Sequence, residues 1–216
     1  MAKIPNWSDD YWLLLLQLYL SKPVGIKPMY SKALVDLAVE LHIHPKLLFN
    51  KQCQIATLQT PRIERIWERY GRSPQRLARA ARLLREMKVY GNADMFYEGV
   101  ELNESFEKDF KPVEPGSPWS PVALILVLDL YFRLTPNTMV TETPEVQELA
   151  ALLKVKAVDV VEVMDIFQRL DPYLNRRDVM LSGLVGPCSD VWRRYGNADV
   201  DKLVAYANEL KVYFEN

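Results

Sequence analysis

An internal repeat constrains this chain more than any other feature of its sequence. Residues 7–20 match residues 119–132 at an offset of 112 positions, from a Trp-Ser pair at the start to a Leu-Tyr pair near the end. Beyond an insertion in the second copy, Trp67–Gly71 reads Trp-Glu-Arg-Tyr-Gly and Trp192–Gly196 reads Trp-Arg-Arg-Tyr-Gly. Similarity over about 100 residues indicates two copies of a domain, because solenoid repeats are only about 20–50 residues long.

The chain of 216 residues has room for two domains of the usual size. We predict a first repeat over residues 1–97, called copy one, and a second over residues 118–216, called copy two. Residues 98–117 between them carry six acidic side chains against two lysines and contain two prolines. This composition predicts an acidic linker. Phe106 and Phe110, four residues apart, can attach the linker to a domain surface.

Apolar residues recur at helical spacing through most of both copies, and strand-like alternation is confined to Asp178–Leu184. The expected helices in copy one cover residues 11–20, 32–41, 45–58, 63–70 and 73–90. Those in copy two cover residues 122–134, 145–153, 157–170, 189–195 and 200–214. We therefore predict an all-α fold of two tandem helix-turn-helix-like domains with at most a short β-hairpin.

Composition limits the partners of the protein. The formal net charge is −1, so any attraction to nucleic acid must come from a local charged surface. Cys53 and Cys188 are too few for a disulfide framework and lack metal-ligand spacing. The longest apolar run near the N-terminus, residues 12–16, is too short to span a membrane, and no small-residue cleavage site follows it. We expect a cytoplasmic protein with no membrane partner.

Motifs for catalysis and cofactor binding are missing from the sequence. No cysteine or carboxylate completes a metal-ligand set with its two histidines, His42 and His44, so we interpret them as a polar turn. No Gly-rich phosphate loop or nucleophile elbow occurs. We interpret the repeated Trp-x-x-Tyr-Gly element as an aromatic anchor that closes the core where a helix stops. The sequence thus predicts a protein that is not an enzyme and has no cofactor or metal.

The second and third expected helices of each copy have the spacing of a helix-turn-helix motif. A small residue, Ala38 or Ala150, precedes the turn, and apolar residues follow at the turn and along the next helix. His42 and Lys154 occupy the turn position where glycine often lies. Such a turn sets the second helix at a steep angle and lets it enter a major groove. A purely structural helix pair is the alternative interpretation.

The two candidate recognition helices differ in charge. Copy one offers side chains that can meet phosphates or purine edges: Lys46, Asn50, Lys51 and Gln52. Copy two offers carboxylates that would repel a phosphate backbone: Asp159, Glu162 and Asp165. We therefore expect copy one to read DNA, and copy two to pair, brace or bind a protein.

Copy one also contains the largest local excess of positive charge. Nine cations, spaced mostly three or four residues apart, face only Glu64, Glu68 and Glu86, and we call them the basic stripe: Arg62, Arg65, Arg69, Arg72, Arg76, Arg79, Arg82, Arg85 and Lys88. Arginine is well suited to bidentate phosphate contacts. The alternatives are an ordinary solvated helix face and a stripe masked by the acidic linker. In copy two, Arg176 and Arg177 could make a wing-like contact with the DNA backbone.

Copy two carries an ordered set of landmarks: Trp119, Leu128–Arg133, Val146–Leu153, Phe167–Pro172, Gly183-Leu184 and Val191-Trp192. This set resembles the predicted DNA-binding N-terminal module found ahead of HNH-type nuclease domains in bacterial restriction-like proteins. The module usually has an Arg at the start of its second helix and an Asn before the Phe, where this chain has Lys156 or neutral neighbours and Ile166. The resemblance implies a DNA-binding module without a nuclease domain.

These features combine into one leading hypothesis, a bacterial-type regulator that binds duplex DNA through copy one. Lys46, Asn50 and Lys51 would contact bases and the arginines would contact phosphates. Replacing Arg72, Arg76, Arg79 and Arg82 by Glu should then abolish binding without unfolding the domain. The competing hypothesis is a protein-interaction scaffold that binds an acidic partner, and a third is a regulator that takes a small ligand between the copies.

Overall fold

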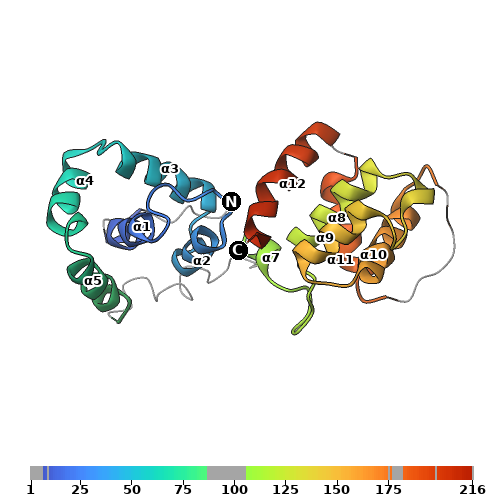
Figure 1. Ribbon diagram of the computed structural model, residues 1–216, viewed down its shortest axis with the longest axis horizontal. Helices are drawn as coiled ribbons and strands as arrows, with labels where there is room; N and C mark the ends of the chain where they lie inside the picture. The colour runs from blue at the N-terminus through green and yellow to red at the C-terminus, as the bar shows by residue number, and fades with distance from the viewer. Residues whose placement is uncertain are drawn as a thin grey trace. The chain divides into compact units, whose positions relative to one another are not determined.

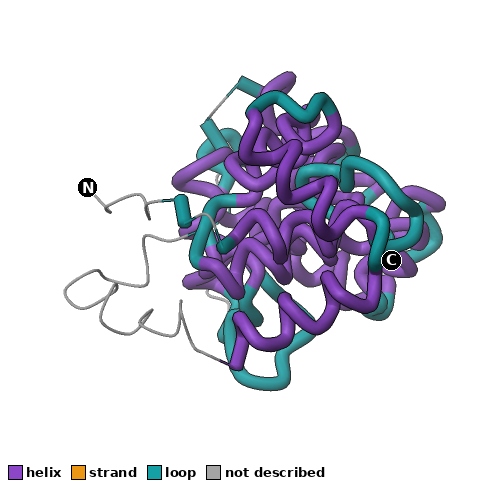
Figure 2. The backbone as a smooth tube through the Cα atoms, turned by 90° about the vertical axis from the view of Figure 1, so that its left-hand side faces the viewer, coloured by secondary structure: helices purple, strands orange, loops and turns teal. Residues whose placement is uncertain are grey.

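The computed structural model describes residues 7–8, 10–86, 106–174, 176, 182–197 and 199–215. These residues form helices and loops and no strand, which confirms the predicted all-α class (Figure 2). Of the segment expected as a hairpin strand, residues 178–181 lie outside this part of the chain and Ser182–Leu184 lead into a helix through a turn. The chain divides into two compact units, residues 1–107 (unit 1) and 108–215 (unit 2).

Unit 1 is organised around its first helix, α1 (Tyr11–Leu20). The helices that pack on α1 are α2 (Lys32–Leu41), α3 (Pro45–Ala56), α4 (Pro61–Ile66) and α5 (Pro74–Glu86), and a π-helical turn, η1 (Trp67–Gly71), joins the last two (Figure 1). Trp12 and three consecutive leucines of α1 are buried. The apolar surface all round α1 explains its central place, because a helix of this kind must be covered on every side.

Unit 2 has the same plan around α8 (Pro121–Arg133), whose residues from Val122 to Tyr131 are all buried. The four helices that pack on α8 are α9 (Pro144–Leu153), α10 (Ala157–Leu170), α11 (Val185–Tyr195) and α12 (Val200–Phe214). A short 3-10 helix, η3 (Pro136–Thr138), follows α8. Ser120 starts α8 by accepting a hydrogen bond from the Ala123 N–H at 3.3 Å, and Pro121 occupies the first helical position.

The boundary between the units falls inside the predicted linker 98–117, of which residues 98–105 lie outside the described part. Phe106 packs against the core of unit 1. The short helix α7 (Glu107–Phe110) follows it. The Phe110 ring lies 5.1 Å from the Tyr213 ring of unit 2. The last part of the predicted linker is therefore packed on the units, with Phe106 on unit 1 and Phe110 on unit 2.

The Trp-x-x-Tyr-Gly element has an equivalent aromatic contact in each unit. The Trp67 ring meets Tyr19 of α1 edge-on at 6.1 Å, and the Trp192 ring meets Tyr131 of α8 edge-on at 6.0 Å. The glycine is not explained by a left-handed helix end, since Gly196 has φ −65°. A Cβ atom would instead lie 3.2 Å from the Trp67 ring at Gly71 and 2.6 Å from the Trp192 ring at Gly196. The tryptophan four residues earlier folds over the glycine, so a side chain at this position is disfavoured, more strongly at Gly196 than at Gly71.

Candidate nucleic-acid interface

The turn between the two candidate motif helices has the same backbone geometry in both units. His42 ends α2 with φ 54°, and Lys154 ends α9 with φ 58°, so both residues are left-handed. The N–H of the following residue donates to the Ala38 carbonyl at 2.9 Å and to the Ala150 carbonyl at 3.0 Å, respectively. The turn has three residues in each unit, the left-handed residue and the two that follow it, and it leads into α3 in unit 1 and α10 in unit 2. The left-handed residue supplies the sharp change of direction that glycine often provides.

The second helix of this pair is more accessible in unit 1 than in unit 2. The buried residues of α3 form one narrow stripe: Pro45, Leu48, Gln52 and Ile55. Those of α10 cover more of its circumference: Val160, Val163, Met164, Ile166, Phe167 and Gln168. Helix α10 packs against α8, α9 and α11, whereas α3 packs mainly against α1 and α2. An open side is what a helix needs to enter a groove, and α3 has the larger one.

Two of the expected base-contacting residues lie on the open side of α3. Lys46 and Asn50 are both exposed and are four residues apart, so their side chains project in similar directions. Lys51 is half-buried, and its ammonium lies 5.1 Å and 5.2 Å from the ring centroids of Trp7 and Trp12. Such a cation–π contact occupies Lys51 within unit 1.

Gln52, the fourth polar residue of this helix, is fully buried. Its Oε1 accepts a hydrogen bond from the Lys27 N–H at 2.7 Å and so ties the loop before α2 to α3. Gln52 therefore cannot read a base, and Lys46 and Asn50 remain as the accessible pair.

All eight arginines of the basic stripe are exposed, while Lys88 lies outside the described residues. Arg85 has a structural role, because its guanidinium donates to both carboxylate oxygens of Glu40 at 2.6 Å and 3.0 Å and to Gln17 at 3.2 Å. Arg82 lies 3.5 Å from Glu86. Within the described part of the chain, Arg65, Arg72 and Arg79 form no ion pair. These three arginines are available to an outside anion.

Arg69 and Arg76 contact an aromatic ring instead of a carboxylate. Their guanidinium carbons lie 5.5 Å and 5.6 Å from the centroid of the Tyr70 ring, within the range of a cation–π interaction. This cluster was not predicted from the sequence, although an Arg-Tyr pair followed six residues later by an arginine is its visible signal.

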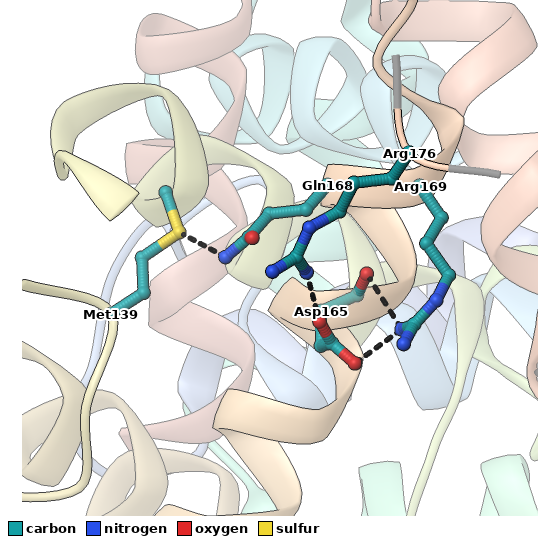
Figure 3. Close-up of polar contacts among 5 residues, drawn as sticks. All are labelled: Met139, Asp165, Gln168, Arg169 and Arg176. Carbon is teal, nitrogen blue, oxygen red and sulfur yellow. Dashed lines mark hydrogen bonds and ion pairs between the residues drawn. The ribbon is translucent and has the colours of Figure 1, made fainter. Parts of the chain in front are cut away.

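In unit 2 the expected wing residue Arg176 already has a partner. Its Nη1 lies 2.6 Å from Oδ1 of Asp165 on α10, and Arg169 donates to the other oxygen of the same carboxylate (Figure 3). Asp159 is also used internally, because it accepts a hydrogen bond from the Lys156 N–H at 3.1 Å at the start of α10. Arg177 lies outside the described residues. Six residues of α10 are buried, and two of its three carboxylates, Asp159 and Asp165, are engaged within unit 2.

The two histidines have separate roles at the turn before α3. His42 Nδ1 lies 2.8 Å from Oε1 of the buried Glu107. His44 is the N-cap of α3, and its Nδ1 accepts a hydrogen bond from the Lys46 N–H at 3.2 Å. No group of three metal-ligating side chains occurs in the described residues.

Acid is expected to destabilise unit 1 through His44. Burial, and to a smaller extent the charge of Lys46, lowers the pKa of His44 below its ordinary value of 6.5. The neutral ring is favoured in the folded state, so its contribution is complete above about pH 6.5 and is lost as the pH falls through the folded pKa. The cap bond itself is worth about 0.5–2 kcal/mol.

The measurement is urea unfolding between pH 5 and pH 8 for the wild type and for His44→Asn, which keeps a capping oxygen and cannot titrate. The free energy of unfolding should fall less steeply with acid in His44→Asn. His44→Ala is the matched control, since it cannot titrate either but lacks the capping atom, so it should show the same flatter pH profile at a lower stability. Equal pH profiles for the wild type and His44→Asn would refute this role.

No helix in the described ranges is long and apolar enough to cross a membrane. Comparison with protein-family models, curated proteins and solved structures finds no match to the chain.

Proposed function

We propose that this chain is a non-enzymatic DNA-binding protein that contacts the duplex backbone mainly through unit 1. The observation that carries the proposal is the basic stripe, whose eight arginines are all exposed in a protein with a net charge of −1. Arg72 lies in the turn between η1 and α5, and the other seven lie on α4, η1 and α5. Three of the eight, Arg65, Arg72 and Arg79, make no ion pair in the described part of the chain.

The chemistry of these side chains favours phosphate as their partner. A guanidinium group presents a planar set of donors that matches two phosphate oxygens, and it stays charged at any physiological pH. The buried residues of α5 are Leu77, Ala81 and Leu84, and at 100° per residue Arg79 lies on the opposite side of the helix. Arg79 can therefore reach an anion without disturbing the core.

In this proposal α3 is the helix that approaches the bases. Its exposed Lys46 and Asn50 provide a cation for phosphate or guanine and an amide that matches adenine. The helix-turn-helix interpretation is part of the proposal and is supported by the left-handed turn at His42 and by the open side of α3.

Unit 2 would brace the protein or bind a protein partner, because α10 is covered by α11 and Arg176 is paired with Asp165. The resemblance of copy two to the DNA-binding module ahead of HNH-type nucleases extends to copy one through the internal repeat and supports DNA as the partner of the protein. A bacterial-type cytoplasmic regulator without a cofactor is the biological role that fits these features.

The alternative function is a protein-interaction scaffold in which the arginines bind an acidic protein. Ion pairs such as Arg85–Glu40 and Arg194–Asp109 favour it, since they show arginines of this chain engaged by carboxylates. DNA is the better proposal because three exposed arginines, Arg65, Arg72 and Arg79, form no ion pair in the described residues, and arginine is well suited to bidentate phosphate contacts.

The test is binding of the purified protein to a pool of random duplex DNA over a series of salt concentrations. If about five phosphates are neutralised, the logarithm of the binding constant should fall with the logarithm of salt concentration with a slope of about −4 to −5. Selection from the same pool would then give the preferred site. No binding at low salt would overturn the proposal in favour of the scaffold.

A further inference from the structure

We propose that Tyr70 is a positioning residue that holds Arg69 and Arg76 ready to bind backbone phosphates. This inference rests on the proposed function and adds to it a reason why these two arginines bind better than flexible ones. The two guanidinium carbons lie 5.5 Å and 5.6 Å from the centroid of the same ring.

The ring joins two structural elements. Arg69 and Tyr70 belong to η1, and Arg76 belongs to the first turns of α5. Tyr70 is half-buried, and η1 is fixed to the core by the contact of Trp67 with Tyr19. The cation–π contacts with Tyr70 therefore tie both arginines to a rigid part of unit 1.

A cation–π contact leaves N–H donors of an arginine available to a phosphate. The guanidinium uses its flat face on an aromatic ring, while its N–H groups point outward in the plane. Arginine is also rich in rotamers, and part of that freedom must be lost when it binds a phosphate. If the ring restricts the side chain beforehand, less entropy is lost on binding and the affinity rises.

Unit 2 shows the same ring without free cations around it. Arg194 lies 5.1 Å from the Tyr195 centroid, but it also donates to Asp109 at 3.0 Å. The Tyr195 ring also stacks on the Tyr206 ring at 5.9 Å. In the repeat, Lys202 replaces Arg76, and its ammonium lies 3.8 Å from Asp199. Two arginines contact one tyrosine ring in unit 1, the unit to which we assign phosphate contacts, whereas the equivalent cations of unit 2 are paired with carboxylates.

The experiment compares Tyr70→Leu with Tyr70→Phe and with the matched unit 2 variant Tyr195→Leu, using duplex DNA over a salt series. Tyr70→Leu should bind about 3- to 10-fold more weakly with an unchanged salt slope, because every cation is still present. Tyr70→Phe should restore most of the affinity, since a phenyl ring keeps the cation–π contact. By contrast, Arg69→Gln with Arg76→Gln should make the slope shallower by about 1.8.

The outcomes separate the inference from the proposed function. If the wild type does not bind duplex DNA, both are overturned. If the wild type binds and a folded Tyr70→Leu binds equally well, only the role of Tyr70 is overturned. A second measurement needs no variant: NMR relaxation of the arginine Nε–H groups in the free protein should show Arg69 and Arg76 more ordered than Arg72. Equal mobility of the three arginines would also overturn the positioning role of Tyr70.

Discussion

Reversing the charge of two arginines, Arg72→Glu with Arg79→Glu, is expected to weaken duplex DNA binding by about 100-fold or more. A hydrogen bond to a charged group is worth about 1.5–3 kcal/mol, and two are lost. Each glutamate also repels the phosphate that the arginine contacted. Both arginines are exposed and form no ion pair in the described part of the chain, so unit 1 should remain folded. Arg76 and Arg82 are left unchanged because they already contact Tyr70 and Glu86.

The matched control is Arg193→Glu with Lys202→Glu in unit 2, which changes the net charge by the same amount. Both side chains are well exposed, at 75% and 83%, and their ion pairs with Asp190 and Asp199 are surface pairs that contribute little to stability. Fluorescence titration of the same labelled duplex at about 0.1 M salt measures both variants. Equal losses in the two would mean that net charge, and not the basic stripe, determines binding.

Gly196→Ala is expected to lower the free energy of unfolding of unit 2 by about 3 kcal/mol, the upper part of the range for overpacking. The added Cβ would lie 2.6 Å from the Trp192 ring and 2.7 Å from the Trp192 carbonyl oxygen. The ring cannot move easily, since it also packs on Tyr131, Phe132 and Phe167. Hydrogen exchange of the α8 and α11 amides in the full chain measures the loss in unit 2 itself.

Two further substitutions bracket this effect. Gly71→Ala meets the Trp67 ring at the milder distance of 3.2 Å, so it should cost unit 1 less than about 1.5 kcal/mol. Gly186 lies in α11, the helix that Gly196 caps, and a Cβ atom at Gly186 has no atom within 4 Å. Gly186→Ala should be neutral or stabilising by up to about 1 kcal/mol.

Wild-type stability for Gly196→Ala would show that the Trp192 ring does not limit the space at residue 196.

Helix positions could be predicted from the sequence where the apolar spacing is regular. The expected segments 32–41 and 157–170 coincide with α2 (Lys32–Leu41) and α10 (Ala157–Leu170). The expected helix 63–70 differs, because α4 begins at Pro61 and gives way after Ile66 to the π-helical turn η1. The π-helical turn coincides with Trp67 folding over Gly71, a local packing arrangement that apolar periodicity does not contain.

The candidate site was only partly predictable, because the availability of a charged residue depends on partners far away in sequence. Arg79 and Arg85 have the same chemistry and lie on one helix. Arg85 is engaged by Glu40, 45 residues earlier, whereas Arg79 is not. Gln52 is likewise occupied by a backbone group 25 residues away. Residue type gives the chemistry, and the tertiary contacts decide which side chains can use it.

Because the buried stripe of α3 is narrow, the exposed positions of this helix can be substituted with little effect on folding. Positions 46 and 50 contribute no buried side chain, so a library randomised at them should consist largely of folded proteins. Helix α10 offers fewer such positions, because six of its residues are buried. Unit 1 could therefore acquire new ligand preferences by single substitutions at little cost in stability, and engineering of the protein should begin there.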